Sequence, residues 1–221
     1  SPESKGWAVE AGSLFPFKNI YGSGCGIRNA AFNLPSYVPR PTKIDYDAEL
    51  LKSLALCLTK KNSLSERTFA AIKWVANAYT NTDLFHHHNR IILLMIAFEI
   101  LNGKSKGFDG KKGFAKWLDN LWGIDESAKF PNNQIMNAGP YGKIGWWGYE
   151  FYDMRNKIMH RGNPEGLPMN DSLGRDYFKT GINVFVDSVR EILRKENLLP
   201  PGDKVLEGIM RAGYLMPKNH K

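Results

Sequence analysis

Residues 146–164 have the sequence WWGYEFYDMRNKIMHRGNP, which gives the clearest indication of the fold in this chain. Four of its apolar residues are spaced four, three and four positions apart, and they are Trp147, Phe151, Met154 and Ile158. On an α-helix, which turns by about 100° per residue, this spacing puts all four side chains in one narrow stripe. The stretch therefore predicts an amphipathic helix whose apolar stripe packs into a core.

The opposite side of this predicted helix carries polar side chains. By the same rotation they are Tyr149, Asp153, Asn156 and His160. Arg155 lies on the flank between the two sides. The sequence GNP at 162–164 ends the helix, since glycine and proline are typical of the residues just past a helix end. His160 and Arg161 therefore fall in the last turn, where the negative end of the helix dipole favours cations.

The run Arg155, Asn156, three residues and then His160 resembles the Arg-polar-x3-His motif of the HEPN superfamily, in particular its Apea-like branch. An apolar helix ending in FEILNG, residues 98–103, stands upstream and is similar to a helix of that branch. The resemblance covers residues 63–196. Members of this superfamily are helical bundles, and many of them are metal-independent ribonucleases that pair their motif helices about a twofold axis.

The resemblance implies an all-α, HEPN-like helical bundle of four to five main helices over residues 46–198. Residues 1–45 are rich in Gly and Pro, and we expect an irregular arm or a linker from a preceding domain there. Residues 199–221 are expected to form a short C-terminal helix and a basic tail. Because the chain begins with Ser rather than Met, an additional domain outside it remains an open alternative.

The function that the resemblance implies is a metal-independent endoribonuclease without a cofactor, which cleaves RNA by attack of the 2′-hydroxyl. Arg155 and His160 are the expected catalytic residues, with Asn156 one helical turn before the histidine. The imidazole would move a proton and the guanidinium would stabilise charge on phosphorus. Five positions separate Arg155 from His160, which turns their side chains about 140° apart on a regular helix. Either the helix end is distorted, or two copies build the site; the resemblance implies a homodimer through the motif helix.

Further residues of the same stretch are expected to bind substrate, and they are Asp153, Lys157 and Arg161. Glu99 follows a buried apolar run and needs a partner, for which Arg155 is the candidate. The competing interpretation is a non-catalytic HEPN module that binds nucleic acid or protein and dimerises. In that interpretation Arg155 pairs structurally with Glu99, and His160 only caps the helix. By analogy with the family, the nuclease would serve in phage defence or as a toxin with an antitoxin partner.

Periodicity predicts further helices. One begins near Asp45 or Asp47, with Leu51, Leu54 and Leu58 on its core face. A capping box of Ser63 and Glu66 begins the next, antiparallel to the first, with Phe69, Ile72, Ala76 and Tyr79 facing the core. Later helices are expected over residues 84–102, 114–121, 178–192 and 204–212. Of these, the helix of 84–102 is apolar on all sides and should be the most buried. The core face predicted for the helix of 178–192 has residues spaced four, three, four and three positions apart, and they are Phe178, Ile182, Phe185, Val189 and Ile192.

The composition indicates the cellular compartment and the chemical class of binding partner to expect. The net charge is +8, which favours an anionic partner, with RNA first. Two cysteines, Cys25 and Cys57, are too few for a disulfide framework and indicate a reducing, cytoplasmic setting. No apolar run is long enough to cross a membrane. The run 86–88 of three histidines lacks the spacing of a metal site, because consecutive helical residues point about 100° apart.

A segment with five lysines lies upstream of the helix predicted for residues 146–164. Its lysines are Lys104, Lys106, Lys111, Lys112 and Lys116. They are either a surface that follows the phosphates of RNA or an ordinary solvated face. Trp117 and Trp122 follow, and we expect them in the core rather than free to stack on bases.

Overall fold

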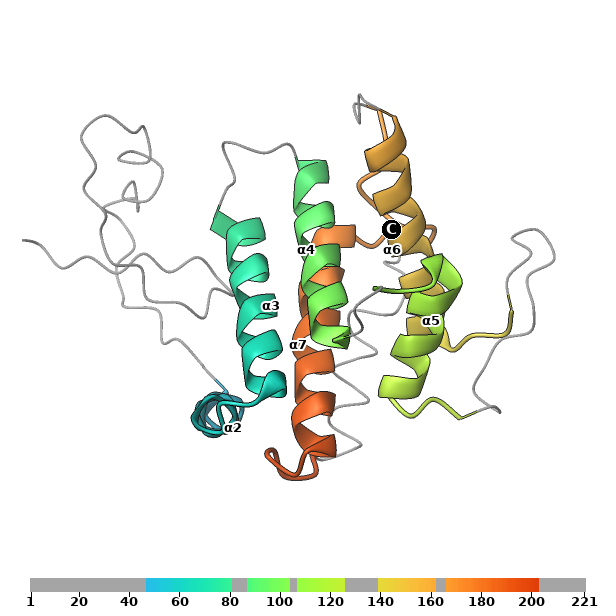
Figure 1. The fold of residues 1–221 in the computed structure, drawn as a ribbon. Helices are drawn as coiled ribbons and strands as arrows, with labels where there is room; N and C mark the ends of the chain where they lie inside the picture. The colour runs from blue at the N-terminus through green and yellow to red at the C-terminus, as the bar shows by residue number, and fades with distance from the viewer. Residues whose placement is uncertain (1–46, 81–86, 104–106, 126–138, 162–165, 203–221) are drawn as a thin grey trace, which may run out of the picture. The chain divides into compact units, whose positions relative to one another are not determined.

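The computed structural model describes residues 47–80, 87–103, 107–125, 139–161 and 166–202. Six helices form in these residues (Figure 1): α2 (Ala48–Thr59), α3 (Ser63–Thr80), α4 (His87–Asn102), α5 (Gly110–Leu121), α6 (Lys143–His160) and α7 (Tyr177–Lys195). Four of them have 16 to 19 residues, whereas α2 and α5 have 12 each. No strand is found in the described ranges, so the all-α class is confirmed. The predictions for residues 1–45 and 204–212 lie outside them.

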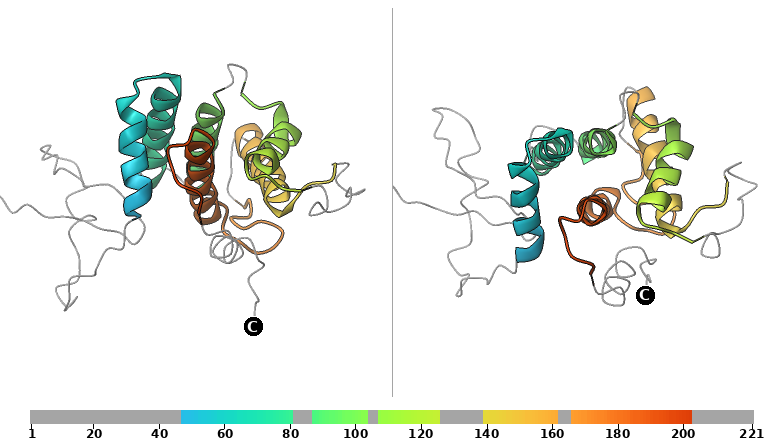
Figure 2. Two further views of the ribbon diagram at one scale, coloured as in Figure 1. Left: turned by 90° about the horizontal axis from the view of Figure 1, so that it is seen from below. Right: turned by 60° about the horizontal axis from the view of Figure 1, so that its bottom comes forward.

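Helix α4 is the centre of the core, as its apolar sequence predicted. It packs against α3, α6 and α7 (Figures 1 and 2). Its fully buried side chains are Ile91, Leu94, Met95, Ala97, Phe98 and Leu101. The ring of Phe98 makes contacts of 5.2–6.3 Å between centroids with rings of α5, α6 and α7. Aromatic packing around this one residue therefore joins four helices.

The stripe predicted for residues 146–164 is confirmed in α6. Trp147, Phe151, Met154 and Ile158 are all buried. The helix begins at Lys143, earlier than its apolar pattern indicates. The cause is a carboxylate from another helix: Asp119, near the end of α5, accepts hydrogen bonds from the backbone N–H groups of Gly142 and Gly145 at 2.9 and 3.0 Å. These donors have no partner within their own helix, so Asp119 caps α6 from outside.

Helix α2 presents a different face to the core from the one predicted. Its buried residues are Leu50, Ser53 and Cys57. Leu51 and Leu58, predicted to face the core, are 39% and 43% exposed. Leucines at several successive positions make two stripes possible, and spacing alone does not choose between them. Figure 1 shows α2 along its axis while α3 stands upright, so the predicted antiparallel pairing of these two helices is also wrong.

The capping box of α3 consists of Asn62 and Ser65, one residue before the predicted pair of Ser63 and Glu66. Asn62 Oδ1 accepts from the Ser65 N–H at 2.9 Å, and Ser65 Oγ accepts from the Asn62 N–H at 3.0 Å. The exchange satisfies two backbone donors at once. The buried residues of the helix are Leu64, Ser65, Thr68, Ala71 and Ala78. Phe69, predicted to face the core, is exposed, with Lys73 over its ring.

Helix α7 follows its predicted pattern closely. Asp176 accepts a hydrogen bond from the Lys179 N–H at 2.8 Å and caps the helix. Of the five predicted core residues, four are buried, namely Phe178, Phe185, Val189 and Ile192. Ser188 of α7 lies 3.4 Å from Nε1 of Trp122, which is buried as predicted.

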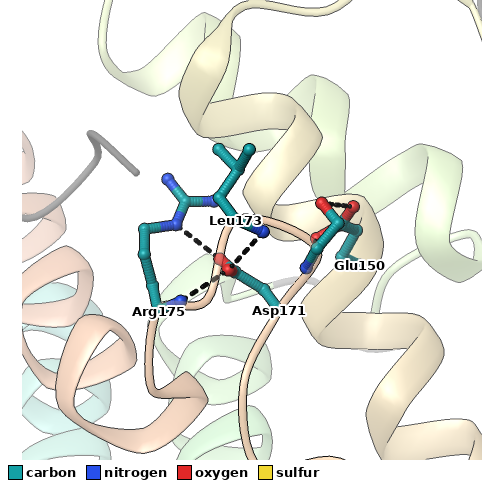
Figure 3. A network of polar contacts seen from close by, with 5 residues as sticks. Glu150, Asp171, Leu173 and Arg175 are labelled. Atoms are coloured by element: carbon teal, nitrogen blue, oxygen red, sulfur yellow. Dashed lines mark hydrogen bonds and ion pairs between the residues drawn. The ribbon is translucent and has the colours of Figure 1, made fainter. Parts of the chain in front are cut away.

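The segment before α7 is held by a polar network (Figure 3). The buried Asp171 carboxylate accepts from the backbone N–H groups of Leu173 and Arg175 and from the Arg175 side chain. Glu150 of α6 accepts from both the backbone and the hydroxyl of Ser172. Burial raises the pKa of the neighbouring Tyr177, aided by the charges of Glu150 and Asp171. This network fixes residues 170–177 against the helix that carries the motif.

Candidate functional site

The polar residues of the motif lie along the C-terminal half of α6. His160, Lys157 and Arg161 are exposed, whereas Arg155 and Asn156 are half-buried. The helix remains regular to its end, and the Arg161 N–H donates to the Lys157 carbonyl at 3.2 Å. A distorted helix end therefore does not bring Arg155 and His160 together within one chain. The motif is open to solvent rather than enclosed in the core.

Arg155 contacts its own helix. Its Nη1 donates to Asn156 Oδ1 at 3.0 Å, and its guanidinium lies 5.7 Å from the centre of the Tyr152 ring. No ion pair joins it to Glu99 among the described residues. The carboxyl group of Glu99 lies instead near Gly107. The structure thus gives no support to the Glu99–Arg155 pair.

His160 is separate from the other two motif residues. Its side chain makes no hydrogen bond or ion pair with any residue that the structure describes, although Asn156 stands one turn before it. Asn156 uses its carbonyl oxygen to accept from Arg155. The structure therefore brings Arg155 and Asn156 together and leaves the imidazole free to meet a ligand or a second chain.

Asp153 is the most connected residue of the polar face. Its carboxylate lies 2.8 Å from Lys111 Nζ and 3.0 Å from Lys157 Nζ. Partial burial raises the pKa of Asp153, but the hydrogen bonds and charges of the two lysines outweigh this and hold it below the ordinary value of 3.8. The hydrogen bond to Asp153 in turn raises the pKa of Lys111, against a smaller lowering by burial. Asp153 and Lys111 are therefore both charged at neutral pH.

Tyr149 does not belong to the open polar face on which the sequence placed it. It is buried in a small apolar cluster with Ala115, Tyr141 and Trp146. Lys111 of α5 lies over the Tyr149 ring, with its Nζ 4.6 Å from the ring centre. The correction has a physical reason: α5 packs against this side of α6, which the sequence pattern of α6 alone cannot reveal.

The upstream lysines that the structure describes differ in their surroundings. Lys111 contacts α6, Lys112 and Lys116 are exposed, and Lys104 and Lys106 lie outside the described residues. Trp117 is half-buried and stacks on Phe114 at 5.9 Å, so it belongs to the core. The sequence predicted Lys111 only as one of these five lysines, and its contact with Asp153 was missed because no local signal connects it with a residue 42 positions later.

Within the described ranges, no group of three or more His, Cys, Asp or Glu side chains is placed to hold a metal ion. His88 Nε2 instead lies 3.3 Å from the Leu167 carbonyl oxygen. His86, and the side chain of His87, lie outside the description. No described helix combines the length and apolarity that a membrane crossing requires.

The basic and polar side chains of α6, joined by Lys111 of α5, thus form the candidate site, which suits an anionic ligand with phosphate groups. Comparisons with protein-family models, with curated proteins and with solved structures found no match for the chain.

Proposed function

We propose that the protein is a HEPN-type, metal-independent endoribonuclease that acts as a homodimer. The observation that carries the proposal is the exposure of His160 at the end of α6, with Arg155 and Asn156 also accessible on the preceding turn. The motif that resembles the HEPN superfamily is thereby available to a substrate. The helical bundle around it and the net charge of +8 agree with a domain that binds RNA.

The proposed reaction needs two kinds of side chain. An imidazole of His160 takes the proton from a 2′-hydroxyl, whose oxygen attacks the adjacent phosphorus. The bond from phosphorus to the 5′-oxygen breaks, and the leaving oxygen takes up a proton from the imidazole of the second copy or from water. Arg155 stabilises the negative charge on the phosphoryl oxygens. The products carry a 2′,3′-cyclic phosphate and a 5′-hydroxyl.

Two copies are needed because one helix cannot supply both groups to one phosphate. With α6 regular through His160, the five-position spacing keeps the guanidinium and the imidazole on different sides of the helix. Pairing the helix with its copy would let Arg155 of one chain approach His160 of the other. Lys157 and Arg161, both exposed, would then contact neighbouring phosphates. By family analogy, the enzyme would act in the cytoplasm in phage defence or as a toxin held by an antitoxin.

The experiment that tests the proposal is cleavage of a mixed RNA pool in EDTA. We expect the wild-type chain to cleave and His160→Ala to lose about 10²–10⁴-fold in rate, the contribution typical of a general acid or base. Arg155→Ala should lose activity as well, and cyclic phosphate ends should appear on the products. Met159→Ala is the matched control, because Met159 is exposed next to His160 and carries no titratable group. Cleavage that survives both site substitutions at the wild-type rate would refute the proposal.

A non-catalytic HEPN module is the second candidate. The observation that favours it is the engagement of Arg155 with Asn156 and with the Tyr152 ring, which a purely structural arginine would also show. This module would bind RNA or a protein partner and dimerise without cleaving. RNA that is bound by the wild-type chain and remains intact would decide in its favour.

A further inference from the structure

Lys111 is the residue that the fold adds to the polar face of α6. It stands near the start of α5, yet its Nζ lies 2.8 Å from Asp153 Oδ1. Lys157 Nζ approaches the other carboxylate oxygen, Oδ2, at 3.0 Å. One carboxylate therefore holds two ammonium groups from two helices side by side.

The charges of this group do not cancel. Two ammonium groups face one carboxylate, which leaves one positive charge in excess. The side chains of Lys111 and Lys157 are 37% and 50% exposed, against 29% for Asp153. An ammonium group has three N–H donors, and one from each lysine suffices for the bond to Asp153. Donors and charge therefore remain available to an anion that approaches from solvent.

An ordinary surface ion pair explains only part of this arrangement. Such a pair contributes about 0.2–1 kcal/mol to stability and needs one lysine, not two. Lys111 is also positioned over the Tyr149 ring at 4.6 Å. Its neighbours on α5, Lys112 and Lys116, are exposed and form no ion pair with any residue in the described ranges. Lys111 is thus held in place, whereas comparable lysines on the same helix are not.

The position of the group relates it to the motif. Asp153, Lys157 and His160 are spaced four and three positions apart, so they share one face of α6. A phosphate bound by the two lysines would therefore lie on the same face as the imidazole. Successive phosphates of an RNA strand are suited to bridge two such points along one helix.

We propose that Lys111 and Lys157, held together by Asp153, bind an RNA backbone phosphate adjacent to the one that is cleaved. The proposal rests on the function proposed above and adds a specific phosphate site to it. The two lysines contact the ligand. Asp153 is a positioning residue that acts through them.

The first test measures binding of a fluorescein-labelled single-stranded RNA of mixed sequence by anisotropy at several salt concentrations. It uses His160→Ala as the background, so that the RNA stays intact. Added Lys111→Ala or Lys157→Ala should weaken binding and reduce the slope of log K against log salt by about 0.7 each. Lys112→Ala, which removes an equal charge one position away, should leave the slope nearer to that of the background. Equal effects of Lys111→Ala and Lys112→Ala would overturn the proposal, because they would indicate a diffuse charge effect.

The second test asks whether Asp153 positions the lysines. Asp153→Asn removes a negative charge, so simple electrostatics predicts tighter RNA binding. The proposal predicts weaker RNA binding by Asp153→Asn, because the two lysines lose the carboxylate that holds them. Asp153→Glu keeps a carboxylate and should retain part of the RNA affinity that Asp153→Asn loses. Circular dichroism and thermal unfolding verify that each variant is folded. Tighter binding by a folded Asp153→Asn chain would overturn the positioning role.

Failure of this site is distinguishable from failure of the nuclease proposal. Cleavage that disappears in His160→Ala, with Lys111→Ala binding RNA like the Lys112→Ala control, removes the phosphate site and leaves the nuclease. Weakened binding by Lys111→Ala, with no cleavage by the wild-type chain, removes the nuclease and leaves the phosphate site. A wild-type chain that neither binds nor cleaves RNA removes both.

Discussion

Asp119 shows how much of the site depends on a single side chain. Its carboxylate is buried and accepts hydrogen bonds from Gly142 and Gly145 at the N-terminus of α6. A Cβ on Gly145 would lie only 2.6 Å from the carboxylate oxygens, so glycine is required for this close approach. The start of the motif helix is therefore set by a residue of α5.

We expect Asp119→Ala to lower the free energy of unfolding by about 2–4 kcal/mol, because two backbone donors lose their acceptor in a buried place. Asp119→Asn keeps one good acceptor and should cost less. Chemical denaturation followed by circular dichroism measures both. The control is Asn120→Ala, at the exposed next position, which should stay within about 0.5 kcal/mol of the wild type. A loss as small as that of the control would show that the cap contributes little.

At the scale of the helix, the sequence predicted best where only one apolar stripe was available. In α6 the four residues of the predicted stripe are buried, and in α7 all of the predicted stripe except Ile182 is buried, although both helices also bury residues outside these stripes, such as Tyr149. In α2 the leucines offer two stripes, and in α3 the aromatic Phe69 suggested a face that the fold leaves exposed. Periodicity identifies a helix, but the choice of face depends on neighbours that are distant in sequence.

The two stripes of α2 can be separated by experiment. Leu50→Ala removes a buried side chain and should cost about 2–5 kcal/mol of stability, whereas the exposed Leu51→Ala should cost less than about 1 kcal/mol. Both substitutions have the same chemistry and adjacent positions, so each serves as the control for the other. Urea unfolding midpoints at constant m-value provide the comparison. If Leu51→Ala lowered stability more than Leu50→Ala, the face of α2 that the sequence predicted would be the one that packs into the core.

Across the whole chain, the sequence predicted only those members of the candidate site that lie close together in one short motif. Arg155, Asn156 and His160 are visible in one short motif, and their separation on the helix follows from its geometry. The sequence did not predict that Lys111 belongs to the candidate site, because only the packing of α5 along α6 places it beside Asp153. The same packing holds α5 at both ends, through Lys111 to Asp153 and through Asp119 to the start of α6. The scaffold of the site is thus a pair of helices rather than one.

The separation of Arg155 and His160 leads to a test at the scale of the assembly. If one chain supplies the guanidinium and its copy the imidazole, Arg155→Ala and His160→Ala chains are each inactive alone but complement each other when mixed. Random pairing puts half of the chains in mixed dimers, in which one guanidinium and one imidazole still face each other, so up to about a quarter of the wild-type activity should return. The two variants carry different affinity tags and are refolded together, and capture through both tags in sequence verifies that mixed dimers formed. RNA cleavage in EDTA is then compared with each variant refolded alone. Mixed dimers as inactive as the single variants would mean that no site is shared between copies, and a chain that sediments as a monomer at assay concentration would mean the same.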